Sequence, residues 1–249
     1  MTIPRIYFPE NVVKGERYKL GGQNLHYLKS VLRMRDGDRL FLFDGEGFES
    51  EALIRALTAR DVTVEIVKKE RVADKAVRIT LFQGLPKANK MDFIVRKATE
   101  LGVDTIVPFT SARTIPRISP EMAVLRTSRW QKIATEAARQ CGSPSVPKIK
   151  EIHSFAELME RSEGEALKLI FWEEEAEMGL KQVLQDKGHV REFSIVIGPE
   201  GGFLKEEIAK AMTYGFISVG LGRQILKVET AALAILSIIQ YERGIFGNA

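Results

Sequence analysis

The sequence predicts an α/β fold in two parts, a small β-rich domain followed by a larger domain in which strands and helices alternate. Two observations support this prediction: short alternating apolar runs near the start, and a regular succession of strand and helix patterns after Val77. We place the domain boundary between residues 72 and 73, which gives domains of residues 1–72 and 73–249.

The first domain has strand and turn patterns and little else. Two apolar-rich runs flank Asp44-Gly45-Glu46-Gly47, which is typical of a β-hairpin. The segment "DVTVEIVKK" alternates apolar and polar residues from Val62 to Ile66, as a half-exposed strand does. The polar stretch Glu70–Lys75 is the best candidate for a linker.

In the second domain, strand patterns alternate with helix patterns. The strand patterns are "VRITLFQGL", "DTIVPF", "LKLIFW", "FSIVIG" and "FISVGLG". The helix patterns are "KMDFIVRKATELGV", "SRWQKIATEAARQCG", "EMGLKQVLQDKG", "KEEIAKAMTYG" and "VETAALAILSIIQYERG". Such alternation predicts a largely parallel sheet with helices on both faces.

Two of these helix patterns carry signals for their ends. In the first, Phe93, Ile94, Lys97/Ala98 and Leu101 recur at helical spacing, and Gly102 ends the pattern. In the second, Ser128 is the expected N-cap and Gly142 the expected stop.

Composition excludes several classes of protein. The longest lipid-like run, Ala231–Ile239, is far shorter than the about 20 residues of a membrane helix. The single cysteine, Cys141, rules out an internal disulfide and fits a reducing cytoplasm, which with the lack of an apolar leader predicts a cytoplasmic protein. Its sequence neighbours include no histidine, so we expect an unreactive thiol. The 3 histidines are scattered, so we expect no metal site.

The charge is unevenly distributed along the chain. The whole sequence has a net charge of +4, but residues 77–150 alone carry +8, whereas residues 151–249 carry −6. A basic segment of this kind indicates a polyanionic partner such as a nucleic acid, although a solvated basic surface is the alternative.

The segment "IVIGPEGGF" places a glycine-rich turn after a strand. It does not fit a P-loop, because Phe203 stands five positions after Gly198 and no Lys-Ser/Thr pair follows. It does not fit a dinucleotide loop either, since Glu200 would place a carboxylate where a pyrophosphate belongs. The spacing therefore excludes a nucleotide hydrolase and leaves a ligand loop at the carboxyl end of a strand, or a tight strand–helix turn without a ligand.

A second glycine loop, "VGLGRQILKVET", follows the last strand. Two such loops after two strands can flank one pocket, with Ile225 and Leu226 as an apolar wall for a flat ring or, alternatively, as ordinary core. Each loop alone is weak evidence for a ligand site, and the two loops together are stronger evidence.

At these loops the sequence resembles the RsmE-type methyltransferases of the SPOUT superfamily. The matching stretches are "HYLKSVLRMRDGD" (26–38), "KMDFIVRKATELGVDTIVPFTSAR" (90–113), "RWQKIATEAARQCG" (129–142), "IGPEGGF" (197–203) and "LGRQILKVETAALAIL" (221–236). The last two, in that order, are highly specific. The resemblance implies methylation of N3 of a uridine in 16S ribosomal RNA of the small subunit, with S-adenosylmethionine as cofactor.

The resemblance also implies a fold and an assembly. The first domain would be a PUA-like β-barrel that helps to hold RNA, and the second a SPOUT-type α/β domain with a C-terminal trefoil knot. The family is homodimeric, with the active site completed across the interface. The apolar helix Ala231–Ile239 is the interface candidate, or alternatively part of the core.

The family motifs place the cofactor in the two glycine loops and at the end of the "LKLIFW" strand. The residues are Phe171, Trp172, Glu173, Ile197, Gly198, Pro199, Glu200, Gly201, Gly202, Leu221, Gly222, Ile225 and Leu226. The chain departs from the family pattern at Gln224 and Lys227, where arginines are usual, and Arg223 stands one place early. Leu204 stands where a capping Ser or Thr is usual, which we expect to cost about 1 kcal/mol of stability.

Methylation of a uridine N3 requires the loss of its proton and stabilisation of the resulting anion. We predict that Glu229 is the base or positions it, and that Lys227 or Arg223 stabilises the uridinate. A first-turn helix carboxylate without a catalytic role is the alternative for Glu229.

Basic residues, most of them in the +8 segment, are predicted to hold the RNA. They are His26, Arg33, Lys87, Lys90, Arg96, Arg113, Arg117 and Arg139. Arg113 and Arg117 lie in "SARTIPRISP", expected to be a loop that is free to reach outward. A second hypothesis stays open, an RNA-binding protein that kept the fold and lost turnover, and the Gln224 and Lys227 departures favour it.

Overall fold

The computed structural model describes residues 3–72, 76–162 and 166–246. The chain forms two compact units, one of residues 1–74 with 138–146 and one of residues 75–137 with 147–249. The predicted boundary between residues 72 and 73 adjoins residues outside the described part, and it stays a prediction.

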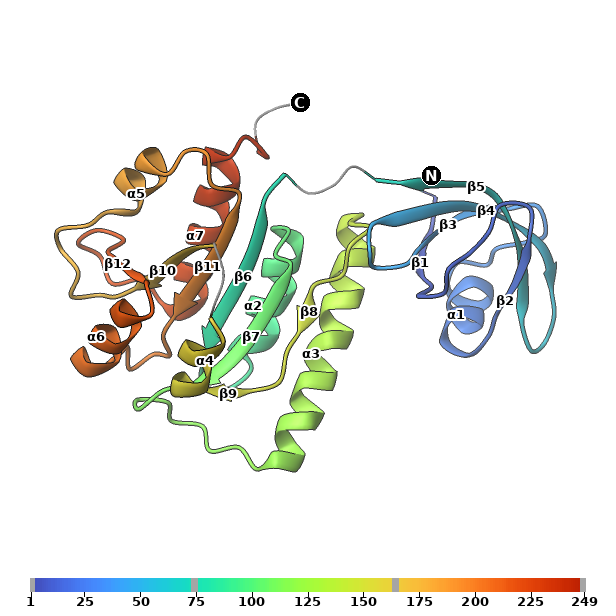
Figure 1. Cartoon of the computed structure of the whole chain (residues 1–249). Helices are drawn as coiled ribbons and strands as arrows, with labels where there is room; N and C mark the ends of the chain where they lie inside the picture. Colours follow the sequence, from blue (N-terminus) through green and yellow to red (C-terminus); the bar gives the residue numbers. More distant parts are fainter. Residues whose placement is uncertain (1–2, 73–75, 163–165, 247–249) are drawn as a thin grey trace. The chain divides into compact units, whose positions relative to one another are not determined.

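The N-terminal unit is a five-stranded sheet with the strand order β1-β3-β4-β5-β2. Its strands are β1 (Arg5–Tyr7), β2 (Arg17–Leu20), β3 (Arg39–Phe43), β4 (Phe48–Leu57) and β5 (Val62–Arg71). The predicted hairpin joins β3 to β4, and β5 buries Val62, Val64 and Ile66 as its alternation predicts. Two register shifts in the β4–β5 pair bend the strands, so that the sheet curls around its core (Figure 1).

The C-terminal unit contains a parallel sheet with the strand order β12-β10-β11-β6-β7-β8, and β9 pairs with β7. Its strands are β6 (Arg78–Gly84), β7 (Thr105–Thr110), β8 (Lys148–Ile149), β9 (His153–Ser154), β10 (Leu167–Phe171), β11 (Glu192–Ile197) and β12 (Ile217–Val219). Most residues of the central strands β6, β7 and β11 are buried, as expected for a parallel sheet that is covered on both faces.

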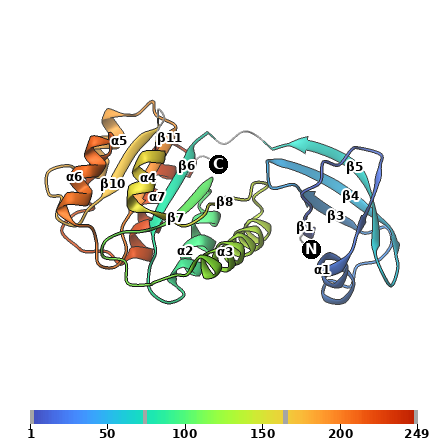
Figure 2. The ribbon, with the colours of Figure 1, turned by 60° about the horizontal axis from the view of Figure 1, so that its bottom comes forward.

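Helices cover both faces of this sheet (Figure 1, Figure 2). They are α2 (Lys90–Glu100), α3 (Pro120–Cys141), α4 (Phe155–Arg161), α5 (Leu180–Asp186), α6 (Lys205–Thr213) and α7 (Val228–Glu242). On one face, Phe155 of α4 and Ile208 of α6 share a core with Phe82 and Val196 of the sheet. On the other face, α7 packs against α2 and β11. The α/β fold predicted from the sequence is confirmed, and the knotted threading of the chain stays a prediction.

Two local predictions are wrong, the start of α3 and the start of the linker. Helix α3 begins at Pro120 rather than after Ser128, because Ser119 caps it and Pro120 takes the first helical position, where a missing N–H costs nothing. The helix predicted before Gly102 is confirmed as α2, which buries the face of Met91, Ile94, Val95, Ala98 and Thr99 and leaves Phe93 exposed. The predicted linker begins too early, since Glu70 and Arg71 still belong to β5, and residues 73–75 lie outside the described part.

Some short elements were not predicted. They are β1, β2, β8, β9, α4, helix α1 (Gly22–His26) and the π-helical turn η1 (Tyr27–Val31). The start of α4 did have a sequence signal, because Ser154 and Glu157 form a capping box there.

Candidate functional site

The ends of three neighbouring strands meet at one edge of the parallel sheet. Phe171 of β10 is the cross-strand partner of both Ile197 of β11 and Val219 of β12. Since the strands are parallel, the loops that follow these residues open on the same side, which is the edge where open α/β sheets bind ligands.

A cavity of about 200 Å³ lies among these loops. All the residues predicted to bind a cofactor line it, except Gly201. The other lining residues are Lys90, Phe203, Val219, Gln224, Lys227, Val228 and Ala231. The structure therefore brings the two glycine loops and the Phe171–Glu173 segment together around one pocket.

The first glycine loop is tightly packed against β6. A Cβ on Gly84, the last residue of β6, would lie 2.5 Å from the Pro199 nitrogen, so no side chain fits there. Gly202 has a φ of +67°, in the left-handed region that favours glycine. Gly84 was missed by sequence reasoning, although a glycine that ends a strand pattern is a signal of close backbone approach.

The second glycine loop carries an uncovered apolar side chain. A Cβ on Gly220 would lie 2.3 Å from the carbonyl oxygen of Glu175, which fixes the start of this loop against a neighbouring segment. Ile225 lines the cavity and is 81% exposed, an unusual position for a large aliphatic residue unless a ligand or partner covers it.

Three charged side chains meet where the first glycine loop approaches the N-termini of α2 and α7. Lys90 Nζ lies 3.1 Å from Glu200 Oε1 and 3.3 Å from Glu229 Oε2, and the second contact is an ion pair without hydrogen-bonding geometry. The backbone N–H of Lys87 also donates to Glu200 at 3.1 Å. The carboxylate of Glu200 is therefore already paired within the protein.

These contacts shift two pKa values. Burial of Glu200 raises its pKa, but hydrogen bonds from its own amide, from Lys90 and from the Lys87 amide outweigh burial and lower the pKa below 4.5. The hydrogen bond to Glu200 raises the pKa of Lys90 above 10.5, and Glu229 adds to this effect. Glu200 and Lys90 are therefore both charged at neutral pH.

The predicted catalytic residues lie in or beside the second loop. Lys227 lines the cavity at the N-cap of α7, and Glu229 lies in the first turn of that helix, where it reaches Lys90. Arg223 is exposed and does not line the cavity. The structure thus brings Lys227 and Glu229 to the site and leaves Arg223 at its rim.

The predicted RNA-binding residues are divided between the two units. His26, Arg33 and Arg139 belong to the N-terminal unit, and Lys87, Lys90, Arg96, Arg113 and Arg117 to the C-terminal unit. Arg139 donates to the Tyr27 hydroxyl at 2.6 Å and stacks on its ring at 4.5 Å, so it has a structural role. Lys90 faces the cavity rather than open solvent.

Arg113 does not reach freely outward as predicted. Its guanidinium donates to the carbonyl oxygen of Gly201 at 2.9 Å, and a Cβ on Gly201 would lie 2.9 Å from the Arg113 Cβ. Arg113 therefore supports the first glycine loop. Arg117, farther along the same segment, is exposed.

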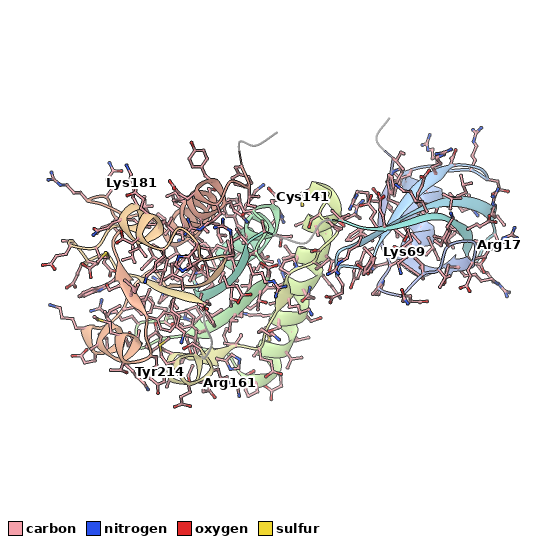
Figure 3. All side chains as sticks on the ribbon, turned by 45° about the horizontal axis from the view of Figure 1, so that its top comes forward. Arg17, Lys69, Cys141, Arg161, Lys181 and Tyr214 are labelled. Atoms are coloured by element: carbon pink, nitrogen blue, oxygen red, sulfur yellow. The ribbon has the colours of Figure 1, made fainter. Side chains whose placement is uncertain are left out.

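Cys141 is exposed at the end of α3 (Figure 3). No cluster of three or more potential metal ligands occurs in residues 3–72, 76–162 and 166–246. Within the same ranges, every helix falls short of the length and apolarity needed to cross a membrane.

Family models match both units of the chain. Residues 73–240 match an RNA methyltransferase domain and residues 20–67 match an RNA methyltransferase PUA domain. Together with a parallel sheet whose strand ends surround a cavity, these matches define the class: the chain is an RNA methyltransferase.

Comparison with individual relatives shows which family of RNA methyltransferases the chain belongs to. Ribosomal RNA small subunit methyltransferase E of Buchnera aphidicola (from Acyrthosiphon pisum) is 31% identical over 98% of this chain and 95% of its own. The protein of that name from Bacillus subtilis is 28% identical over 94% of this chain and 93% of its own. The crystal structure of the Neisseria gonorrhoeae enzyme bound to S-adenosyl methionine has a TM-score of 0.87 at 33% identity, covering 98% of this chain and 100% of that one. The chain belongs to the ribosomal RNA small subunit methyltransferase E family.

Proposed function

We propose that this protein transfers a methyl group from S-adenosylmethionine to N3 of a uridine in 16S ribosomal RNA of the small ribosomal subunit. The observation that carries the proposal is the cavity formed by three strand ends, with the Lys90–Glu200–Glu229 cluster at its wall. The similar enzyme from Neisseria gonorrhoeae, crystallised with S-adenosyl methionine, supports the choice of cofactor.

The residues of the cavity fit such a cofactor. Ile225 and Leu226 offer an apolar wall for an adenine ring, and the glycines of both loops leave backbone groups accessible. The indole N–H of Trp172 is buried and has no hydrogen-bond partner in the described part of the chain, so it can donate to a polar ligand group. When bound, S-adenosylmethionine supplies an electrophilic methyl group.

The protein's own residues must deprotonate the uridine and hold its negative charge. Glu229 takes the N3 proton or positions the group that does, and Lys227 stabilises the uridinate oxygens, with Arg223 available from the rim. The contact with Lys90 and the first turn of α7 hold the Glu229 carboxylate in place at the cavity wall. Its proton transfer depends on alignment with the substrate.

The RNA is held by basic side chains that remain exposed. Lys87, Arg96 and Arg117 of the C-terminal unit, and His26 and Arg33 of the N-terminal unit, are exposed and suited to phosphate contacts. Arg113, Arg139 and Lys90 have structural partners, and their contacts with RNA are secondary in this proposal.

We further propose a cytoplasmic homodimer. Helix α7 buries Ala231, Ile235 and Ile239 inside its own unit, so most of its apolar face is core rather than interface. A smaller apolar surface stays exposed and can contact a second copy of the chain. It consists of Ile238 and Tyr241 of α7 and Phe93 of the adjacent α2.

Radiolabelled methyl transfer to free 16S ribosomal RNA and to small subunits, with identification of the product nucleoside, tests the proposal. N3-methyluridine is the expected product. Binding of RNA and cofactor without transfer would favour the second hypothesis, an RNA-binding protein that has lost turnover.

Substitution Glu229→Gln tests the role of the carboxylate. We expect kcat to fall by about a hundredfold or more, as for the loss of a general base, while the cofactor Kd measured by calorimetry changes little. Full turnover of the variant would eliminate Glu229 as base or base-positioner.

A further inference from the structure

A second pocket lies between the N-terminal parts of α2 and α3. It is a groove of about 340 Å³ that shares no lining residue with the cofactor cavity. Its lining residues are Leu85, Pro86, Ala88, Asn89, Met91, Asp92, Met122, Leu125, Arg126, Arg129 and Trp130. The reaction proposed above assigns no role to this groove.

One wall of the groove is a stripe along α3. Met122, Leu125, Arg126 and Arg129 follow the i, i+3, i+4, i+7 pattern, so they lie on the same side of the helix. Met122 is 46% exposed and Leu125 is 63% exposed. The stripe therefore offers apolar surface and guanidinium groups together, next to solvent.

The charges of the groove favour an anion. Asp92 supplies the negative charge among the described lining residues, and it is already bonded to the indole N–H of Trp130 at 3.1 Å and to Arg129. Arg126 is half-buried and has no hydrogen-bond or ion-pair partner in the part of the chain that the structure describes. Its planar guanidinium suits the oxygens of a phosphate group.

We infer that this groove binds a single-stranded nucleotide that flanks the target uridine, with its phosphate on Arg126 and its base on the apolar wall of Met122 and Leu125. The inference rests on the proposed function. Both pockets reach the first turn of α2, where Lys90 lines the cofactor cavity and Met91 and Asp92 line the groove. Proteins that recognise single-stranded RNA hold splayed bases on such surfaces.

A second copy of this chain fits the groove less well. A symmetric contact that sets the groove of one copy against the groove of another would bury Arg126 opposite the same basic face, which is costly. The basic stretch that contains α3, with its +8 charge over residues 77–150, attracts RNA and repels the same stretch of a second copy.

The test uses two matched pairs of variants on α3. Arg126→Gln removes the positive charge of the groove, and Lys132→Gln removes one from an exposed position outside it. Leu125→Glu places a carboxylate at the groove, and Val124→Glu places one at the adjacent position, which is 71% exposed and outside it. The affinity for unmethylated 16S ribosomal RNA is measured by filter binding at several salt concentrations.

We expect Arg126→Gln and Leu125→Glu to weaken RNA binding about tenfold, with a smaller salt dependence for Arg126→Gln, while both controls stay within about twofold. The cofactor Kd should be unchanged in all four variants. Equal losses within each pair would overturn the inference, and so would a change of oligomeric state confined to the groove variants in sedimentation, which would make the groove an interface between copies. If Arg126→Gln does not fold, the Leu125/Val124 pair decides, since both side chains are exposed.

The binding assay also separates this inference from the proposed function. A wild-type protein that binds 16S ribosomal RNA through Arg126 but transfers no methyl group would contradict the proposed function alone.

Discussion

Lys90 holds a single positive charge between two carboxylates that come from distant parts of the sequence. Glu200 belongs to the first glycine loop and Glu229 to the first turn of α7, so the lysine joins three segments at the cavity wall. The sequence analysis selected all three residues but predicted that Lys90 binds RNA. Charge alone could not distinguish the two roles, because a basic residue in a basic segment looks the same whether or not folding brings carboxylates to it.

The pKa shifts of this cluster predict a pH-dependent stability. The pKa of Glu200 is lower in the folded than in the unfolded protein, so its stabilising effect is present above about pH 4.5 and is lost as the pH falls through the folded pKa. Lys90→Met removes a hydrogen bond that lowers this pKa. We therefore expect acid unfolding of the variant, followed by circular dichroism, to have its midpoint at higher pH than in the wild type.

Lys97→Met is the control for this experiment. Lys97 lies on the same helix and pairs with Glu100 at the surface, where ion pairs contribute little. Identical acid midpoints for the Lys90 and Lys97 variants would contradict a special role for the cluster.

Gly84 shows how a single hydrogen atom in place of a side chain shapes the cavity. We expect Gly84→Ala to displace the loop at Pro199, to reduce stability by about 1–3 kcal/mol, and to weaken cofactor binding, because an added methyl group meets backbone that cannot rotate away. Gly188→Ala, whose nearest contact would be 3.5 Å away, should change stability by less than about 0.5 kcal/mol. Thermal melting and calorimetry compare the two variants, and equal effects would count against close packing at Gly84.

At the scale of helices and strands, most of the large elements could be predicted, because their apolar patterns are long and their ends have glycine or capping signals. Gly102 and Gly142 follow α2 and α3 with φ near +79°, as a left-handed helix stop requires. The start of α3 was missed because its first two turns expose Met122, Val124 and Leu125, so the apolar pattern there does not describe a buried face. The short strands β8 and β9 have too few residues for any periodicity.

Helix α4 is short and depends on its cap. Ser154 accepts a hydrogen bond from the Glu157 amide, and the Glu157 carboxylate accepts one from the Ser154 amide. We expect Ser154→Ala to lower the free energy of unfolding by about 1 kcal/mol and the Tm by about 2–4 °C. Ser154→Thr keeps the hydroxyl and should retain most of the stability in the same melting experiment; a loss equal to that of the alanine variant would argue against the cap.

Helix α6 has only half of this arrangement, as its sequence predicted. Glu207 accepts from the Leu204 amide, but Leu204 has no side-chain acceptor to return the bond. The second oxygen of Glu207 instead accepts from the Ala112 amide at 3.0 Å. The segment that contains Ala112 and Arg113 is thus bonded both to the first glycine loop and to α6, which the separate sequence patterns could not reveal.

At the scale of the whole molecule, the N-terminal unit is not a continuous stretch of chain. Residues 138–146, which follow most of α3, belong to it, and the Val146 amide donates to the Gly45 carbonyl oxygen at 2.9 Å. The sequence suggested two consecutive domains because composition and periodicity change near residue 72. A returning segment of nine residues, 138–146, is too short to change the composition or the periodicity of the sequence around it.

Gly45 packs against Val146 of this returning segment, so a substitution at Gly45 tests what the segment contributes to stability. Its φ is +86°, and an added Cβ would lie 3.0 Å from the Tyr7 ring and 3.3 Å from the Val146 side chain. Gly15, in the same unit, has a φ of +87° with nothing within 4 Å of such a Cβ. The two alanine variants therefore share the backbone strain, on the order of 1 kcal/mol, and differ in packing.

We expect Gly45→Ala to destabilise the N-terminal unit by about 1–3 kcal/mol more than Gly15→Ala, because the added methyl group pushes against Val146 of the returning segment. Hydrogen exchange of peptides from β3, β4 and residues 138–146 measures this locally. Exchange should rise in all three for Gly45→Ala, and stay close to wild type in β10 and β11. A response confined to the β3–β4 hairpin, or equal in the two variants, would mean that residues 138–146 contribute little to the stability of the unit.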